Sequence, residues 1–210
     1  MILHGYFRSG TSYRTRIALN LKGLSYETHG VDLRTGAQKS DAYLALNPQG
    51  MVPALETPEG VLVQSPAILE WLEERHPRPP LLPENAMDRA TVRAMAAVIG
   101  CDIHPLNNLR VLKALRSQFE ADQAMVDDWA ARWITPGFET LEILVARHGR
   151  GWSFGDTPGL IDCYLIPQIY SARRFNVPLD AFPRLLAIEA AAADHPAFIA
   201  AHPDRQPDAD

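Results

Sequence analysis

The sequence has little cysteine, no excess of basic residues and no long hydrophobic run. Its 2 cysteines, Cys101 and Cys163, match no metal-ligand spacing, so we expect two free thiols buried in helices. Lys and Arg number 20 against 25 Asp and Glu, and the formal charge of -5 argues against a nucleic-acid-binding surface, which normally needs a basic field. Because no apolar stretch reaches about twenty residues and none opens the chain, we expect a cytoplasmic protein with no membrane span and no export signal.

A proline-rich segment divides the chain into two regions with different patterns. Proline fills four of the seven positions from 77 to 83, which suits an extended linker and cannot continue a helix. The pattern before it predicts strands near 2–6, 25–31, 52–56 and 60–63 and helices at 12–22, 41–46 and 66–75. After it, helical periodicity recurs at 90–103, 111–119, 124–145, 160–175 and 185–193. We therefore predict an α/β domain over 1–80, an all-helical domain over 86–210, and a frayed tail from about 201.

Hydroxyl groups and cations are concentrated between the first strand and the first helix. Ser9, Thr11 and Ser12 lie where a helix leaves its first N–H groups without intrahelical partners. Such a terminus favours an anion, and Arg8 and Arg14 add positive charge nearby. The segment indicates either a binding site for a thiolate or carboxylate, or an ordinary helix N-cap.

Short strings spread along the chain carry a family resemblance. They are Tyr6-Phe7-Arg8-Ser9 with Arg14 to Leu19, Ala45 to Gly50, Val52 to Leu55, Gln64 to Ile68, Asp102 to Pro105 and Arg205 to Asp208. In this order and spacing they resemble the zeta class of glutathione transferases, which includes bacterial maleylacetoacetate and maleylpyruvate isomerases. The resemblance implies a thioredoxin-like N-terminal domain, an all-α C-terminal domain, glutathione as cofactor and a homodimer.

The chain departs from the family pattern at two helix starts. The family's first helix usually begins Ser-Ser-Cys-x-Trp, whereas this chain has Thr11 at the cysteine position and so lacks a thiol there. The family also tends to place Ser or Thr where Gly159 stands. Glycine is an acceptable N-cap, and Asp162 can accept a hydrogen bond from its N–H, so we expect that helix to form.

The resemblance assigns several residues to glutathione. Ser9 is implied as the hydroxyl that stabilises the thiolate, with Thr11 as the alternative, Arg8 assisting and Gly10 beside them. The bond before Pro53 is implied to be cis, which presents the Val52 backbone to an extended peptide as an added strand would. From spacing alone, Pro53 is equally an edge-strand residue and the two hydroxyls are equally helix caps.

Further cofactor contacts are implied at later positions. Ser65 is expected as the N-cap of the helix at 66–75, where the γ-glutamyl carboxylate binds with Gln64 orienting it, although capping alone also explains Ser65. Gln38 or Lys39 is assigned to the glycyl carboxylate, and solvated side chains are the alternative. Asp102 and His104 complete the cofactor set, and no metal is expected.

The residues implied for the substrate are Arg8, His104, Asn108, Arg110 and Arg174. His104 and Asn108 are spaced i, i+4 and so share one helix face, where Pro105 is expected to bend the helix and redirect Arg110. A solvent-exposed face is the alternative. We favour Arg174 over Arg173 because its position matches the family, although a cation also suits a helix C-terminus without any ligand. Guanidinium groups bind carboxylates in bidentate fashion, which fits a diacid.

The resemblance implies glutathione-dependent cis–trans isomerisation of a maleyl diacid to its fumaryl isomer. The diacid is maleylacetoacetate, from tyrosine breakdown, or maleylpyruvate, from gentisate breakdown; Gly10-Thr11 and Arg110 favour maleylpyruvate. The alternatives are a general transferase that conjugates or dehalogenates, and a non-catalytic glutathione-binding protein. An isomerase regenerates glutathione, a transferase consumes it, and a binding protein turns over neither substrate.

Overall fold

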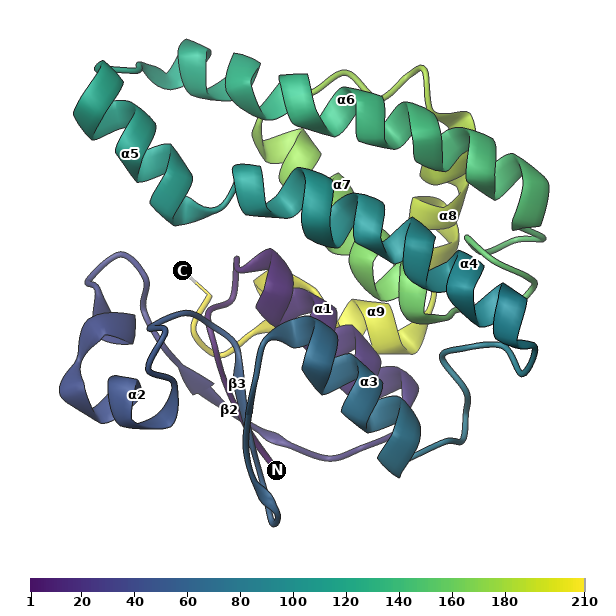
Figure 1. The fold of residues 1–210 in the computed structure, drawn as a ribbon, viewed down its shortest axis with the longest axis horizontal. Helices are drawn as coiled ribbons and strands as arrows, with labels where there is room; N and C mark the ends of the chain where they lie inside the picture. Colours follow the sequence, from purple (N-terminus) through teal and green to yellow (C-terminus); the bar gives the residue numbers. More distant parts are fainter. Residues whose placement is uncertain (210) are drawn as a thin grey trace. The chain divides into compact units, whose positions relative to one another are not determined.

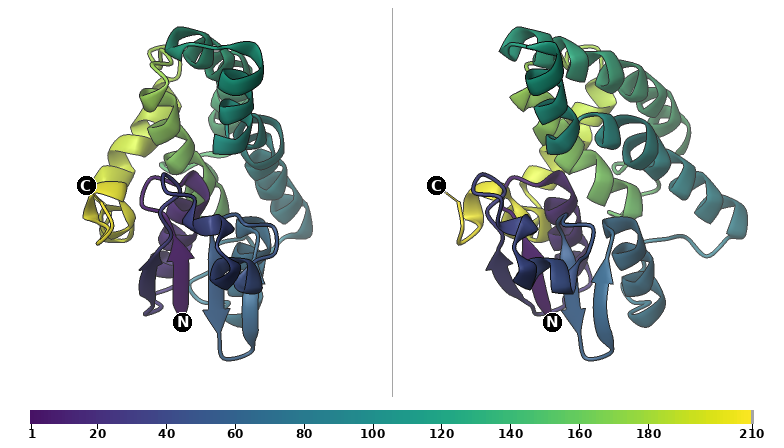
Figure 2. Two further views of the ribbon diagram at one scale, coloured as in Figure 1. Left: turned by 90° about the vertical axis from the view of Figure 1, so that its left-hand side faces the viewer. Right: turned by 60° about the vertical axis from the view of Figure 1, so that its left-hand side comes forward.

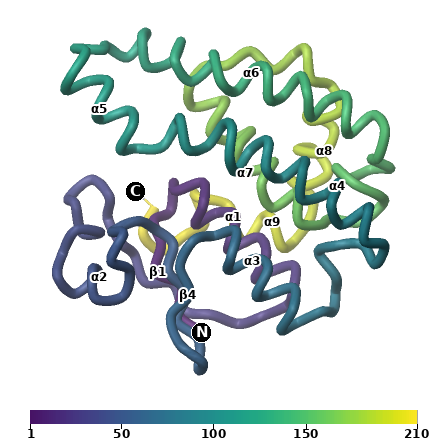
Figure 3. Tube along the Cα trace, in the orientation of Figure 1, coloured from purple at the N-terminus to yellow at the C-terminus, as the bar shows by residue number. Residues whose placement is uncertain are grey.

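The computed structural model describes residues 1–209, which divide into two compact units. The first unit comprises Met1–Leu81 together with the chain from Ala193 onward, and the second is Leu82–Ala192. The helical pattern predicts one domain from 86 to the end, whereas the structure groups the residues from Ala193 onward with the first unit. Figure 3 shows this final segment returning beside the first helix of the chain.

The first unit is a four-stranded sheet flanked by helices (Figure 1). Its strand order is β2-β1-β3-β4, with β1 parallel to β2 and antiparallel to β3. The strands are β1 Ile2–Gly5, β2 Glu27–Gly30, β3 Ala54–Thr57 and β4 Gly60–Val63, and the helices are α1 Gly10–Leu21, η1 Ala37–Lys39, α2 Asp41–Leu46, α3 Ser65–Arg75, α9 Pro196–Ala201 and η4 Pro203–Arg205. The predicted α/β domain is confirmed.

Helices α1 and α3 lie on one face of this sheet and α2 lies on the other; α2 and the strands are also seen from two further sides in Figure 2. On α3, Ile68, Leu69 and Leu72 are fully buried, as their helical spacing predicts. Leu3 and Leu55, paired across β1 and β3, are buried as well. Burial of this size stabilises by roughly 1.5–3 kcal/mol for each large apolar side chain, so the sheet and its helices form one core.

The second unit is helical, as the sequence predicts. Its elements are α4 Ala86–Ala97, the π-helical turn η2 Val98–Ile103, η3 His104–Leu106, α5 Leu109–Phe119, α6 Gln123–His148, α7 Leu160–Arg174 and α8 Pro183–Ala193. None of the helices within residues 1–209 combines the length and apolar character needed to cross a lipid bilayer.

Two expectations about side chains and chain ends are wrong. Cys163 is buried as expected, but Cys101 is exposed: Ile99 and Ile103 are buried, and Cys101, two residues from each, lies on the opposite face of the turn. The tail is folded rather than frayed over the residues that the structure describes: η4 forms at Pro203–Arg205, and the Gln206 amide donates to the carbonyls of Ala200 and His202 at 3.0 and 2.9 Å. The polar residues that signal fraying in the sequence serve here as turn and cap partners.

Helix α7 begins with the glycine cap that the sequence analysis expects to be tolerated. The Asp162 carboxylate accepts hydrogen bonds from the N–H of Gly159 at 2.8 Å and from the hydroxyl of Ser153 at 2.6 Å. Asp162 is completely buried, and this burial raises its pKa to about 6. The expectation that this helix forms is confirmed.

Candidate active site

The N-terminus of α1 presents two linked hydroxyl groups. Ser9 is the N-cap, and its Oγ accepts from the N–H of Ser12 at 3.3 Å. Ser9 Oγ and Thr11 Oγ1 lie 3.0 Å apart, and Thr11 Oγ1 donates to the carbonyl of Val52 at 2.9 Å. A hydroxyl has only one proton to donate. Since that of Thr11 is directed to Val52, the Ser9 proton is the one that can turn to a ligand without breaking this contact.

The backbone opposite these hydroxyls is the loop that leads into β3. The Val52–Pro53 peptide bond is cis, which confirms the expectation from the resemblance. Just before it, the carbonyl of Met51 accepts from the hydroxyl of Tyr43 at 2.7 Å and from the amide of Asn47 at 2.6 Å. Burial raises the pKa of Tyr43 to about 12, so the phenol stays protonated and donates. The Val52 backbone is thereby fixed beside the start of α1.

A buried cation from α1 lies beside the N-terminus of α3. Gln64 is the N-cap and Ser65 the first helical residue, so the expectation of Ser65 as the cap is wrong by one position. Gln64 has φ 68°, a left-handed conformation that turns the chain sharply into the helix. Arg14, 2% exposed, donates from Nη1 to Ser65 Oγ at 3.0 Å. Free helical N–H groups together with a guanidinium make this terminus suitable for a carboxylate.

Polar side chains from three segments surround the loop before Val52. The Gln64 amide donates to Gln49 Oε1 at 2.6 Å, and Lys39 Nζ lies 3.4 Å from the carbonyl of Gln49. Within residues 1–209, Gln38 Oε1 is buried and has no hydrogen-bond partner. A buried acceptor of this kind suits an N–H donor of a ligand. In the sequence, Gln49 is only one residue of the string from Ala45 to Gly50, and its position beside Gln64 is seen only in the folded chain.

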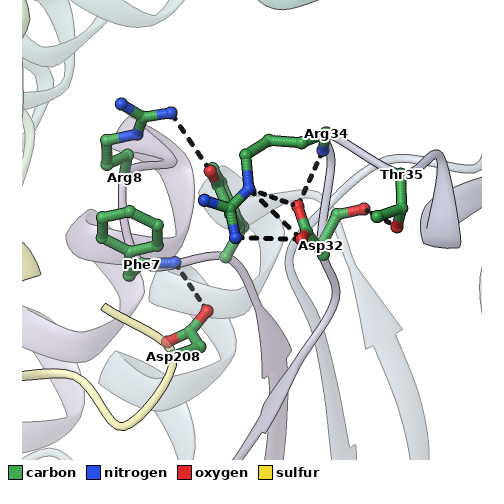
Figure 4. A network of polar contacts seen from close by, with 7 residues as sticks. Phe7, Arg8, Asp32, Arg34, Thr35 and Asp208 are labelled. Carbon is green, nitrogen blue, oxygen red and sulfur yellow. Dashed lines mark hydrogen bonds and ion pairs between the residues drawn. The ribbon is translucent and has the colours of Figure 1, made fainter. Parts of the chain in front are cut away.

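Arg8 is held by the aromatic residues that precede it (Figure 4). Its Nη2 donates to the Tyr6 hydroxyl at 3.2 Å, and its guanidinium lies 5.2 Å from the centre of the Phe7 ring. The guanidinium of Arg34 lies 5.9 Å from the Tyr6 ring, while Arg34 also binds Asp32 at 3.0 Å. Hydrogen bonds from Arg34 hold the pKa of Asp32 below its usual value. The contact between Arg8 and the Tyr6 hydroxyl has no signal in the sequence and is seen only in the folded chain.

In the second unit, the expected helix through His104 and Asn108 does not exist. His104 begins η3, and Asn108 is the N-cap of α5, where its Oδ1 accepts from the N–H groups of Arg110 and Val111 at 3.2 and 3.3 Å. The prediction that His104 and Asn108 share a helix face is therefore wrong. Pro105 supplies no N–H and Asn108 caps the next helix, so the chain breaks rather than bends between them.

The remaining candidates of the second unit are exposed. Asp102 lies in η2, Arg110 in the first turn of α5, and Arg174 is the last residue of α7. The guanidinium of Arg174 lies 5.9 Å from the ring centre of Phe175, whereas Arg173 forms a two-pronged ion pair with Glu189 at 2.9 and 2.5 Å. Arg173 is therefore engaged within the unit, and the choice of Arg174 over Arg173 stays a prediction. Over residues 1–209, no group of His, Cys, Asp or Glu side chains is arranged to hold a metal ion.

An α/β unit with a cis-proline loop beside a hydroxyl-capped helix, continued by a helical unit, defines a protein of the glutathione transferase class. The family model for the glutathione S-transferase N-terminal domain matches residues 8–75. A maleylpyruvate isomerase from a Ralstonia species is 54% identical over 99% of both chains. A maleylacetoacetate isomerase from Pseudomonas aeruginosa is 53% identical over 99% of this chain and 98% of its own length.

Solved structures agree with these relatives. The holo structure of a maleyl pyruvate isomerase, described as a bacterial zeta-class glutathione S-transferase, has a TM-score of 0.98 and 52% identity and covers 100% of both chains. A maleylacetoacetate isomerase from Anaeromyxobacter dehalogenans with glutathione bound in its active site has a TM-score of 0.90, 45% identity and coverage of 100% of this chain and 97% of its own. A second structure of that protein holds dicarboxyethyl glutathione and citrate, with a TM-score of 0.89, 43% identity and coverage of 100% and 93%. The chain belongs to the zeta-class glutathione S-transferases.

Proposed function

We propose that this protein is a glutathione-dependent isomerase that converts a maleyl diacid to its fumaryl isomer. The observation that carries the proposal is the Ser9 hydroxyl at the N-terminus of α1, next to the cis-proline loop. Position 11 is a threonine, so no thiol of the protein stands there. Support comes from the relatives named as maleylpyruvate and maleylacetoacetate isomerases, and from the relative that holds a dicarboxyethyl derivative of glutathione.

The residues of the first unit fit glutathione chemically. The α1 terminus with Ser9 suits a sulfur anion, and the backbone of Val52 suits a peptide. The α3 terminus, with the buried cation of Arg14, suits a carboxylate. The buried oxygen of Gln38 suits a peptide N–H, so we assign Gln38 to the peptide portion of glutathione rather than to its glycyl carboxylate.

Bound glutathione supplies a nucleophilic sulfur that adds reversibly to the carbon–carbon double bond, so that the bond can rotate and re-form. Ser9 donates a hydrogen bond to that sulfur and keeps its proton; together with the α1 terminus and Arg8 it stabilises the thiolate and so lowers the pKa of the thiol. Thr11 keeps Val52 in place through its carbonyl. Gly10, between them, contributes backbone without a side chain at the first helical turn.

The substrate's carboxylates need cations, and we assign these to arginines. Arg8 in the first unit and Arg110 and Arg174 in the second bind carboxylate oxygens, and positive charge stabilises the electron density that the conjugated carbonyl gains. His104 and Asn108 remain proposed substrate contacts, and Asp102 with His104 proposed cofactor contacts. Since the Oδ1 atom of Asn108 caps α5, a substrate contact is left to its Nδ2 group, which donates to the carbonyl of Pro105 at 2.9 Å in this structure.

We further propose a cytoplasmic homodimer that acts in the breakdown of aromatic compounds. The dimer and the location rest on the family resemblance and on the composition described above. Relatives of 54% and 53% identity carry the two different isomerase names, so the proposal covers the maleyl diacid group that both substrates share.

Progress curves with purified maleylpyruvate and maleylacetoacetate, each with and without glutathione, test the proposal. We expect conversion to the fumaryl isomer only with glutathione present, with the glutathione concentration unchanged after many turnovers. Consumption of one glutathione for each product molecule would instead identify a conjugating or dehalogenating transferase. Glutathione affinity without turnover of either diacid would identify a binding protein.

A further inference from the structure

The last residues of the chain reach the segment that carries Arg8 and Ser9. Asp208 Oδ2 accepts a hydrogen bond from the backbone N–H of Phe7 at 3.0 Å, although the two residues are 201 positions apart (Figure 4). Phe7 directly precedes Arg8 and Ser9. A carboxylate that accepts from an N–H makes a charge-assisted hydrogen bond, which is shorter and stronger than one between neutral groups.

The other polar group of Phe7 is held by the same returning segment. Arg16, 1% exposed, donates from Nη2 to the carbonyl of Phe7 at 2.9 Å and from Nε to the carbonyl of Ala201 at 2.8 Å. Both the N–H and the C=O of Phe7 are thus tied to the C-terminal segment, one directly and one through a buried guanidinium. This backbone has little freedom to move while the tail is in place.

The tail also occupies a site shaped to receive it. Ala209 packs against the hydrophobic cluster that includes Tyr6, Phe7 and Val52. A Cβ atom on Gly30 would lie 3.2 Å from Asp208 Cβ, so the absence of a side chain there gives Asp208 its place. Asp208 Oδ1 is buried with no hydrogen-bond partner within residues 1–209. Burying an unpaired carboxylate oxygen costs free energy, which a residue that only fills space would not incur.

We propose that Asp208 is a positioning residue of the glutathione site: through the Phe7 N–H it fixes the backbone that aims the Arg8 guanidinium and the Ser9 hydroxyl. The proposal rests on the function proposed above. Alignment of a hydroxyl donor with a sulfur anion depends on backbone position, because stabilisation by a donor weakens with small displacements. The tail would then belong to the thiol-activating machinery, although it is the last part of the chain.

Three variants test this role. Asp208→Ala removes the acceptor, Asp208→Asn keeps an amide oxygen that can accept the same N–H, and Asp204→Ala removes a carboxylate that is 77% exposed on the same tail. Calorimetric titration gives the dissociation constant of glutathione, and the thiolate absorbance of the bound tripeptide against pH gives the pKa of its thiol. Hydrogen exchange at the Phe7 amide reports on the contact itself without activity.

We expect Asp208→Ala to weaken glutathione binding about tenfold, to raise the pKa of the bound thiol, and to speed exchange at the Phe7 amide. The dissociation constant of glutathione for Asp208→Asn should stay within about threefold of the wild-type value, and that for Asp204→Ala should equal the wild-type value. A purely structural role predicts a lower melting temperature with the thiol pKa unchanged, and that result would overturn the proposal. If Asp208→Ala does not fold, Asp208→Glu moves the carboxylate by one methylene, and an unchanged thiol pKa in that variant would overturn it equally. A wild-type protein that binds glutathione without lowering its thiol pKa would contradict the proposed function instead.

Discussion

The two units hold their candidate functional groups in different ways. In the first unit, hydrogen bonds join segments far apart in the sequence: Thr11 to Val52 across 41 positions and Arg14 to Ser65 across 51. In the second, the Asn108 side chain binds the N–H of Arg110, two residues on. The placement of Thr11 and Arg14 therefore depends on the complete fold of the first unit, whereas Asn108 is held by the start of the helix that it caps.

The largest expected effect comes from a buried ion pair of the first unit. Lys22 Nζ lies 2.6 Å from Glu73 Oε2 and donates to the carbonyl of Pro79 at 2.7 Å, while the N–H of Leu81 donates to the same Glu73 oxygen at 2.8 Å. Glu73→Ala leaves the Lys22 ammonium buried without its carboxylate, and we expect it to lower the free energy of unfolding by about 3–5 kcal/mol. Urea denaturation measures this change.

An exposed pair, between the last residue of α3 and the turn that joins β3 to β4, provides the control. Glu59 and Arg75 lie 3.0 Å apart with side chains more than half exposed. Solvent screens such a pair, so Glu59→Ala should change the free energy of unfolding by no more than about 1 kcal/mol. Equal losses in the two variants would contradict the view that long-range buried contacts hold the first unit together.

The second unit has one buried charge of its own, and its effect depends on pH. Burial raises the pKa of Asp162 to about 6, above its unfolded value of 3.8, so the folded state binds the proton more tightly. The stability that this proton provides is present in full below pH 3.8 and is lost as the pH rises through 6. The loss is on the order of 3 kcal/mol.

Asp162→Asn removes this titration and should flatten the corresponding part of the pH profile. Denaturation with urea at intervals from pH 4 to pH 7 measures the slope in both proteins, and their difference isolates Asp162 from the other titrating groups. Asparagine has one acceptor oxygen where aspartate has two, so at least one donor of Ser153 or Gly159 loses its acceptor. This loss lowers the free energy of unfolding at every pH. Parallel profiles in the two proteins would show that Asp162 does not titrate in this range.

Local signals in the sequence predict much of the fold. The bounds 41–46 and 60–63 agree with α2 and β4, because a serine cap and a glycine turn mark them. The π-helical turn at Val98–Ile103 has no comparable signal. The exposure of Cys101, in contrast, follows from the spacing of the buried Met95, Ile99 and Ile103, which leaves position 101 on the opposite face. The folded tail is missed for another reason: its partner, the Phe7 N–H, lies at the other end of the chain.

The candidate site divides along the same line. Ser9 and Thr11 are predictable because hydroxyls at a helix start have a local signature. The engagement of Thr11 with Val52, of Arg14 with Ser65 and of Arg8 with Tyr6 requires the folded unit. In the second unit Pro105 and Asn108 mark a break between two helices, although the same residues are also compatible with a bend in one helix, which is the prediction that proved wrong.

Two adjacent arginines of the second unit test the role of an exposed, locally held side chain. We expect Arg174→Ala to lower kcat/KM for the maleyl diacid by 10- to 100-fold, equivalent to about 1.4–2.8 kcal/mol, and to leave glutathione affinity unchanged. Steady-state kinetics at varied diacid and varied glutathione separate the two effects. Arg173→Ala, which loses the ion pair with Glu189, is the control and should keep its kinetic constants. Similar losses of kcat/KM in both variants would contradict the assignment of Arg174, rather than Arg173, to the substrate.

The smallest expected effect concerns the long-range contact of Thr11. Thr11→Ala removes a neutral hydrogen bond to Val52, for which we expect a loss of about 1 kcal/mol, or roughly fivefold in glutathione affinity, with little change in the pKa of the bound thiol. Thr11→Ser keeps the hydroxyl and should restore affinity. Ser9→Ala, in contrast, removes the proposed donor to the sulfur and should raise the thiol pKa clearly. If Thr11→Ala raised the thiol pKa as far as Ser9→Ala does, the proton of Thr11 would have to leave Val52 when glutathione binds, and the first unit would rearrange its long-range contacts on binding instead of offering a preformed site.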